Sequence, residues 1–331
     1  MIRSSAPTRI DLAGGTLDIW PLHLFFGNPP TVNAAINLYA TVEIKPRRDK
    51  RIVVQSKDLN LKGDFPSVNA IPEGHALDLI LKTVKFYSPK MGLEITTDCQ
   101  APAGSGIGGS SALNIALHGA LNTLVGHRYL KSQLIEIARN IETQVISAPA
   151  GWQDYFPALY GGALAVRPGV LGVEFKRIPR PLDEMTQRFV LCYTGKPRQS
   201  GINNWEVVKD ALDGKKKTIN HLKKISQAAL DMENVIFNDP LERLAPVFAA
   251  EWKARKALAP GISTPEMDRL IRSAMRSGAL AAKVCGAGGG GCVAFFVKVD
   301  RKEQVQGALS KLGARVLDFR FVSRGLRVQT F

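Results

Sequence analysis

The sequence predicts an α+β protein of two domains, and three observations lead to that prediction. The chain has 331 residues, of which 45% are apolar, so it can bury a large core. Short strand-like segments dominate the first half, whereas long runs at helical spacing dominate the second. Between them, residues 178–182 (I-P-R-P-L) carry two prolines that interrupt both patterns. We therefore expect an N-terminal domain over residues 1–183 and a C-terminal domain over residues 184–331.

The first domain is expected to combine strands with two helices. Strands are predicted at residues 40–44, 51–55 and 92–98, the last of which alternates apolar and polar side chains. Apolar residues then recur at three- and four-residue intervals in two stretches, around residues 112–121 and 130–145. That spacing is typical of helices that bury one face.

The second domain is expected to begin with a strand at residues 188–193. Helical spacing follows at residues 203–212, 215–233, 240–258 and 264–277. Strands at residues 293–297, 315–319 and 326–329 close the chain around a helix at 301–312. The sequence has no internal repeat and no linker-like segment.

Composition narrows the classes of function. The four cysteines form no C-x-x-C pair and the five histidines form no H-E-x-x-H, so we expect buried thiols and no transition-metal site. The chain starts M-I-R-S without an apolar signal region, and it has no run of 18 apolar residues. These features predict a cytoplasmic protein that does not enter a membrane.

The formal net charge of +15 attracts anions in general. The densest basic run, at residues 215–224, contains no Phe, Tyr or Trp that could stack on bases. We therefore expect a solvated helix face there and a phosphorylated small molecule as the anionic partner, with nucleic acid unlikely as a partner. A homodimer stays an open expectation.

The most informative segment is P-A-G-S-G-I-G-G-S-S-A at residues 102–112, which leads from a predicted strand into a predicted helix. The first N–H groups of a helix have no partner inside the helix and the macrodipole is positive there, so a polyphosphate is a natural ligand. The glycines let the backbone approach that anion, and the two serine hydroxyls can cap the helix or coordinate Mg²⁺.

Two other nucleotide-binding patterns are disfavoured in this segment. Gly104, Gly106 and Gly109 spell G-x-G-x-x-G, but a dinucleotide-binding unit needs a second strand and a carboxylate about 20 residues on, where this chain has a predicted helix. A Walker loop needs a lysine after its last glycine, and none follows.

Three further clusters are candidates for chemistry. Arg9 and Asp18 flank a Gly14-Gly15 turn, which suits recognition of hydroxyl groups. Glu142 on the second predicted helix can share Mg²⁺ with Ser111, and Asp154 lies in a loop where it can serve a substrate hydroxyl. Residues 286–291 contain five glycines between apolar strands, so this loop is expected to pack against the first glycine loop or a ligand.

Three segments in this order resemble the three motifs of the GHMP kinases, the family of galactokinase, homoserine kinase, mevalonate kinase and phosphomevalonate kinase. They are P-T-R-I-D-L-A-G-G-T-L-D (7–18), P-A-G-S-G-I-G-G-S-S-A (102–112) and C-G-A-G-G-G-G-C (285–292). The resemblance implies a ribosomal-protein-like N-terminal domain, a ferredoxin-like C-terminal domain, and ATP and Mg²⁺ in the cleft between them.

The resemblance also implies roles for individual residues. Asp154 matches the family's candidate base, which either removes the proton of the acceptor hydroxyl or orients that hydroxyl, and Arg9 matches the basic residue beside it. Ser111 and Glu142 match the Mg²⁺ ligands. The residues implied to bind ATP are Pro102, Gly104, Ser105, Gly106, Ile107, Gly108, Gly109, Ser110 and Ser111. Those implied to bind the substrate are Gly14, Gly15, Thr16, Asp18, Gln153, Gly288 and Gly289.

Within the family, the chain is most similar to bacterial kinases of the anomeric hydroxyl of D-glycero-D-manno-heptose 7-phosphate. Galactokinases carry Glu-His where this chain has Gly15-Thr16, and mevalonate-type enzymes usually carry Lys in place of Arg9. A galactokinase-, fucokinase- or mevalonate-type kinase is the alternative. From other classes, a non-catalytic sugar or ATP sensor and an RNA-binding protein on the same scaffold stay open. The loop at residues 194–201 is a candidate for a second anion, such as a substrate phosphate.

Overall fold

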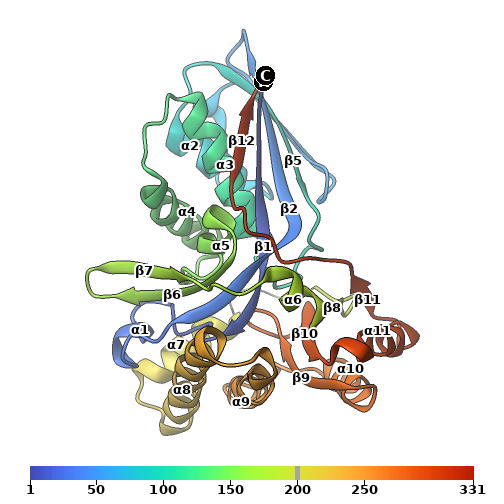
Figure 1. The fold of residues 1–331 in the computed structure, drawn as a ribbon. Helices are drawn as coiled ribbons and strands as arrows, with labels where there is room; N and C mark the ends of the chain where they lie inside the picture. Colours follow the sequence, from blue (N-terminus) through green and yellow to red (C-terminus); the bar gives the residue numbers. More distant parts are fainter. Residues whose placement is uncertain (198–201) are drawn as a thin grey trace.

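A computed structural model describes residues 1–197 and 202–331 of the chain, and these residues form two sheets with helices packed on them (Figure 1). The first sheet has the order β12-β1-β2-β5-β3-β4, and β6 and β7 extend from β2. All neighbours are antiparallel except β3 and β5, which are parallel. The strands are β1 (Ile2–Ala13), β2 (Thr31–Arg47), β3 (Ile52–Ser56), β4 (Leu61–Phe65), β5 (Gly92–Cys99), β6 (Ala163–Gly169), β7 (Gly172–Arg177) and β12 (Arg327–Thr330).

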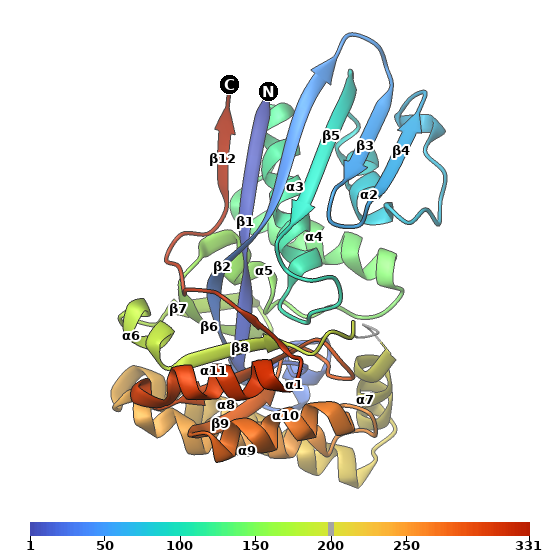
Figure 2. The same cartoon turned by 90° about the vertical axis from the view of Figure 1, so that its right-hand side faces the viewer.

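Helices cover one face of this sheet and enclose the first core (Figure 2). They are α2 (Asp78–Tyr87), α3 (Gly109–Leu124), α4 (Lys131–Ile146) and α5 (Tyr155–Tyr160), with the short α1 (Leu22–Phe25) near the second domain. Helix α3 is buried through most of its length, because it lies between the sheet and the neighbouring helices.

The second sheet has the order β11-β8-β10-β9, and all its neighbours are antiparallel. In chain order the pattern is 4-1-3-2, the order of a ferredoxin-like sheet, so the predicted fold of this domain is confirmed. Its strands are β8 (Phe189–Tyr193), β9 (Ala279–Val284), β10 (Cys292–Val297) and β11 (Arg315–Leu317). Its helices are α6 (Leu182–Gln187), α7 (Ile202–Leu212), α8 (Lys216–Asn238), α9 (Leu244–Lys256), α10 (Pro265–Arg276) and α11 (Lys302–Lys311). Single 3₁₀ turns occur at Val68–Ala70, Leu241–Arg243 and Val299–Arg301.

Strand β10 shows why the two domains pack as one body. Its sequence C-V-A-F-F-V is apolar on both faces, and every residue in it is buried. Phe295 packs in a core with α10 and α11, whereas Phe296 packs in a second core that also contains Ile10 and Leu12 of β1. The second core therefore spans both sheets.

The structure corrects parts of the expected element list. Besides the two predicted helices, the first domain contains α1, α2 and α5, and the strand predicted at 40–44 is the middle of the 17-residue β2. Helices α1 and α5 have four and six residues, too few for a periodic signal. Helix α2 did carry the signal, because Ile80, Leu81, Val84 and Tyr87 are its buried positions at helical spacing.

The last strand leaves the second domain. Strand β12 pairs with β1, so the chain returns to the first sheet and its two ends meet there (Figure 1). The division of the chain at residue 183 stays a proposal, and β12 does not follow it. None of the helices in the described residues is both long and apolar enough to span a membrane.

Candidate active site

A cleft of about 330 Å³ lies where the start of α3 meets the second domain. Its lining comes from β1, the glycine-rich loop, α4, the segment before α5, and residues of α7, α9 and the β9–β10 loop. Of the predicted site residues, the lining includes Arg9, Thr16, Asp18, Pro102, Gly104, Ser105, Gly106, Gly108, Gly109, Ser110, Ser111, Glu142, Gln153 and Asp154. Arg9 and Asp154, which are 145 positions apart in the sequence, thus meet in one cavity.

The glycine-rich loop is fixed from two sides. Gly108 is the N-cap residue of α3 with a φ of 77°, a left-handed conformation that favours glycine. On one side the Arg9 N–H donates to the Ile107 carbonyl oxygen (2.9 Å), and on the other the Cys292 N–H donates to the Ser105 carbonyl oxygen (2.7 Å). Ile107 is fully buried and lies outside the cleft lining, and its predicted part in ATP binding stays a prediction.

The second glycine loop packs against the first, as one of the two sequence hypotheses stated. A Cβ on Gly291 would lie 2.6 Å from the Ser105 carbonyl oxygen. Gly288 and Gly289 lie outside the cleft lining, and their role in substrate binding stays a prediction. The Gly289 N–H donates to the Ile262 carbonyl oxygen (3.0 Å), a Cβ on Gly288 would clash with the same oxygen, and their neighbours Gly286 and Ala287 line the cleft instead.

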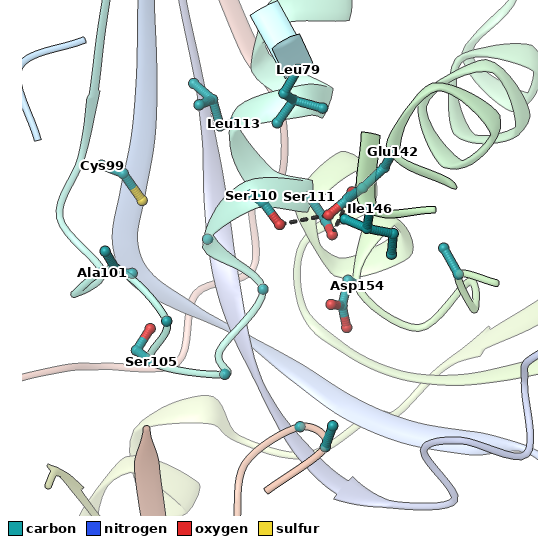
Figure 3. A pocket seen from close by; sticks show the side chains of 18 of the residues that line it. Leu79, Cys99, Ala101, Ser105, Ser110, Ser111, Leu113, Glu142, Ile146 and Asp154 are labelled. Carbon is teal, nitrogen blue, oxygen red and sulfur yellow. Dashed lines mark hydrogen bonds between the residues drawn. The ribbon is translucent and has the colours of Figure 1, made fainter. Parts of the chain in front are cut away.

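Three hydroxyl groups converge on the carboxylate of Glu142. Ser110 donates to Oε1 (2.5 Å), and Ser111 and Tyr155 donate to Oε2 (3.0 and 2.6 Å). Figure 3 shows Ser110, Ser111 and Glu142 pointing toward one another, with Asp154 beside them. Burial, reinforced by the charge of Asp154, raises the pKa of Glu142, and the three hydroxyl donors oppose that shift.

A buried Arg9 and a partly exposed Asp154 form an ion pair in the lining of the cleft. The Arg9 Nε donates to Asp154 Oδ1 (2.8 Å), its Nη2 contacts the same oxygen, and its Nη1 donates to the Gly106 carbonyl oxygen (2.7 Å). The Arg9 side chain is 1% exposed and that of Asp154 is 21% exposed, so water reaches the pair from the carboxylate side. One side chain therefore joins the glycine-rich loop to the carboxylate.

Asp18 is buried at the other end of the cleft. Its Oδ2 accepts from the N–H groups of Trp152 (2.7 Å) and Gln153 (2.9 Å), whereas its Oδ1 has no partner. Burial raises the pKa of Asp18 to about 6, and the charge of Asp154 adds to the shift. The neighbouring Gln153 Oε1 is also buried without a partner. This end of the cleft thus offers two hydrogen-bond acceptors.

Gly14 and Gly15 lie beside this end but outside the cleft lining. A Cβ on Gly14 would meet the Pro30 carbonyl oxygen at 2.2 Å, and one on Gly15 would meet Gln153 Nε2 at 2.9 Å. The two glycines allow the chain to turn tightly before Thr16, which does line the cleft.

A buried group of four charges was missed by the sequence interpretation. Lys283 Nζ donates to Asp11 Oδ2 (2.5 Å) and lies 3.7 Å from Glu251 Oε2. Glu251 Oε1 in turn accepts from Arg255 Nε (2.8 Å). Lys283 and Asp11 each stand in a strand that is otherwise largely apolar (A-L-A-A-K-V and R-I-D-L-A), and a charge in such a strand was the available signal.

The oxygen groups near α3 fit a magnesium ion. Mg²⁺ is usually held by one or two carboxylates together with substrate phosphates and water. Glu142, Ser111 and Asp154 offer oxygen atoms only, and no group of three or more Asp, Glu, His or Cys within the described residues forms a complete metal cage. The site therefore suits a metal that arrives with a phosphate ligand.

Of the predicted anion loop at 194–201, residues 198–201 lie outside the described part of the chain. Lys196, which is described, pairs with Glu266 (3.2 Å).

Comparisons with known proteins agree with this geometry. The N-terminal domain model of the GHMP kinases matches residues 76–162, and the C-terminal model matches residues 237–315. D-glycero-alpha-D-manno-heptose 7-phosphate kinase from Campylobacter jejuni is 29% identical over 342 residues, which cover 98% of each chain. Mevalonate kinase from Pyrococcus furiosus is 24% identical over 352 residues, again 98% of each chain.

Solved structures agree at the level of the fold. A D-glycero-D-manno-heptose 1-phosphate kinase from Bacteroides thetaiotaomicron superposes with a TM-score of 0.80 and 26% identity, covering 100% of this chain and 99% of that one. Residues of all three glycine-containing motifs (7–18, 102–112 and 285–292) line one cleft. The N-terminal and C-terminal models of the family match this chain in that order along the sequence. The chain therefore belongs to the GHMP kinase family.

Proposed function

We propose that the chain transfers the γ-phosphate of ATP to a sugar hydroxyl, and that its acceptor is the anomeric hydroxyl of a heptose 7-phosphate or a closely related sugar. The observation that carries the kinase chemistry is the Arg9–Asp154 pair, which stands directly beside the glycine-rich loop at the start of α3. The choice of a heptose is supported by the full-length match to the heptose phosphate kinases.

The cleft divides into a nucleotide end and an acceptor end. The apolar side chains of Leu79 and Leu113 lie above the serines of α3 in Figure 3, and Ile146 lies beside Ser111 and Glu142. We assign this part of the cleft to the nucleobase, so that the phosphates reach the backbone of the glycine-rich loop at the helix N-terminus. At the other end, Asp18 Oδ1 and Gln153 Oε1 can accept hydrogen bonds from sugar hydroxyls.

The residues between the two ends would orient the reacting groups. Phosphoryl transfer depends on neutralising the phosphate charge and on orienting the attacking oxygen. Asp154 would accept the proton of the acceptor hydroxyl, or orient that hydroxyl, while Arg9 holds the carboxylate in place and adds positive charge beside the loop. Glu142 and Ser111 would hold Mg²⁺, which when bound supplies charge neutralisation to the phosphates.

ADP release tests this proposal. We would measure it with Mg-ATP and heptose 7-phosphate, mannose, fucose, galactose or mevalonate, comparing the native chain with Asp154→Asn. The native chain is expected to turn over the heptose phosphate, and the variant to lose roughly 10²–10⁴ in kcat while keeping its affinity for ATP. Asp183→Asn, an exposed position outside the cleft, is the matched control.

Each other outcome has a defined meaning. Turnover on galactose, fucose or mevalonate alone would contradict the proposed heptose substrate and support the proposed kinase activity. ATP binding without turnover of any acceptor would contradict the proposal and favour a sensor. RNA affinity that falls with salt and survives Asp154→Asn would favour the RNA-binding alternative.

A further inference from the structure

The acceptor end of the cleft depends on a side chain from the second domain. Arg255 of α9 is 2% exposed and lines the cleft. Its Nη1 donates to Thr16 Oγ1 (3.0 Å) and its Nη2 donates to the Gly15 carbonyl oxygen (2.7 Å). Both acceptors belong to the loop at residues 14–18, which we call the acceptor loop and which ends at Asp18.

The acceptor loop has a conformation that needs support. Thr16 has a φ of 74°, in the left-handed region that β-branched residues rarely occupy. The Leu17 N–H donates to the Gly14 carbonyl oxygen and the Ile19 N–H donates to the Thr16 carbonyl oxygen. These two turns link the conformation of Thr16 to the segment that contains Asp18. A change at Thr16 would therefore displace the Asp18 carboxylate.

Arg255 is committed to this loop and not to a free anion. A guanidinium has five N–H groups. Four of them are used by Thr16, Gly15 and Glu251, since Glu251 Oε1 accepts from both Nε (2.8 Å) and Nη2 (2.5 Å). The charge of Arg255 is likewise balanced by that carboxylate, so the planar fork is held in one orientation.

The anchor of Arg255 reaches back to the strand that precedes the acceptor loop. Glu251 also lies near Lys283, and Lys283 donates to Asp11 on β1. All four side chains are buried, so their charges interact without screening by water. Apolar residues in place of a buried charge group often stabilise a fold equally well. Stability alone therefore does not explain these four charges, and we assign them to positioning Arg255.

We propose that Arg255 is a positioning residue that holds the acceptor loop from the second domain and thereby sets the affinity for the phosphoryl acceptor. The expected effect on acceptor affinity rests on the proposed function, whereas the support of the acceptor loop by Arg255 does not. Asn204 of α7 extends the same contact, because its Oδ1 lies 3.4 Å from Thr16 Oγ1 and it also lines the cleft.

Arg255→Lys is the first test, since lysine keeps the positive charge beside Glu251 and loses the fork that contacts Thr16 and Gly15 together. We expect the KM for the acceptor to rise about tenfold, with kcat and the KM for ATP changed less than about twofold. Thr16→Val removes the hydroxyl acceptor without changing a charge, and we expect a smaller rise in the same KM. Lys253→Arg, on the exposed face of the same helix, is the control and is expected to change neither KM.

A second readout needs no acceptor and separates this inference from the proposed function. In Arg255→Lys, amide hydrogen exchange at Leu17 and Ile19 is expected to be at least about tenfold faster than in the native chain, because the loop loses its support. If the native chain turns over no sugar, the proposed function fails and the exchange result alone decides on Arg255. Unchanged exchange at these amides overturns the inference, and so does an equal rise of both KM values. If Arg255→Lys does not fold, Thr16→Val carries both measurements.

Discussion

At the scale of single residues, Asp18 is a buried carboxylate with only one of its two oxygens hydrogen-bonded. The carboxylate is removed from water, two backbone N–H groups donate to one oxygen, and the other oxygen is buried without a hydrogen-bond partner. A Cβ on Gly151 would lie 2.0 Å from Asp18 Oδ2, so the two backbone donors can come close only because residue 151 is glycine. A buried acceptor without a partner costs free energy in the absence of a ligand and contributes to affinity in its presence.

The raised pKa of Asp18 predicts a pH dependence of stability. Its ordinary value of 3.8 rises to about 6 in the folded chain, so the folded state binds more protons than the unfolded state between these values. Stability from this group is fully present below pH 4 and is lost as the pH rises through 6. Asp18→Asn does not titrate, so its unfolding free energy relative to the native chain should increase by up to about 3 kcal/mol between pH 3.5 and pH 7.

Urea unfolding of the two proteins at both pH values measures that difference. Other titrating groups affect both proteins alike and cancel. A difference that does not change with pH would show that Asp18 has an ordinary pKa in the folded chain.

At the scale of elements, the loop between β9 and β10 packs against the backbone of the glycine-rich loop. The chain brings Gly291 against the backbone of residues 104 and 105, and the Cys292 N–H closes the contact on Ser105. The conformation of the loop that we assign to the phosphates therefore depends on a strand of the other domain.

Gly291→Ala tests this dependence. A Cβ there would lie 2.6 Å from the Ser105 carbonyl oxygen, so the glycine-rich loop must move. We expect the KM for ATP to rise about tenfold with little change in the KM for the acceptor. Gly313→Ala is the matched control, since φ is also positive at 81° but no atom lies within 4 Å of its Cβ. Equal effects of the two variants would mean that backbone strain alone accounts for the result.

The sequence predicted those parts of the site that depend on local patterns. Glycines at the start of a helix indicated the loop, and the family resemblance predicted that Arg9 lies beside Asp154 and Ser111 beside Glu142, as they do in the structure. The roles of these residues stay predictions. Contacts between distant elements could not be predicted in this way. The donors to Asp18 lie 134 and 135 residues away, and the position of Gly289 depends on Ile262 in the segment after α9.

At the scale of the whole molecule, the two domains share a core and a buried group of charges. Lys283 is fully buried between Asp11 of the first domain and Glu251 of the second. Burial raises the pKa of Asp11, but Lys283 and the nearby arginines outweigh that effect and leave the pKa below its ordinary value. Lys283 thus favours the charged form of Asp11 at the domain junction.

Lys283→Met is expected to destabilise the fold strongly, because it keeps the length of the side chain and leaves buried carboxylates without their cation. We expect a loss of about 3–5 kcal/mol in the unfolding free energy, measured with guanidinium chloride. Lys253→Met, on the exposed face of α9, should change it by less than about 0.5 kcal/mol. A small loss for Lys283→Met would indicate that Asp11 takes up a proton when its cation is removed.

The return of β12 to the first sheet has a mechanical consequence. Met1 and Phe331 exchange hydrogen bonds of 2.8 Å at the end of the first sheet that points away from the second domain (Figure 2). The second domain is therefore tethered by two chain crossings, one before β8 and one after β11. Two crossings fix the second domain at two points of the first sheet. The core that both sheets share then holds Arg255 and Gly291 against the loops that they contact.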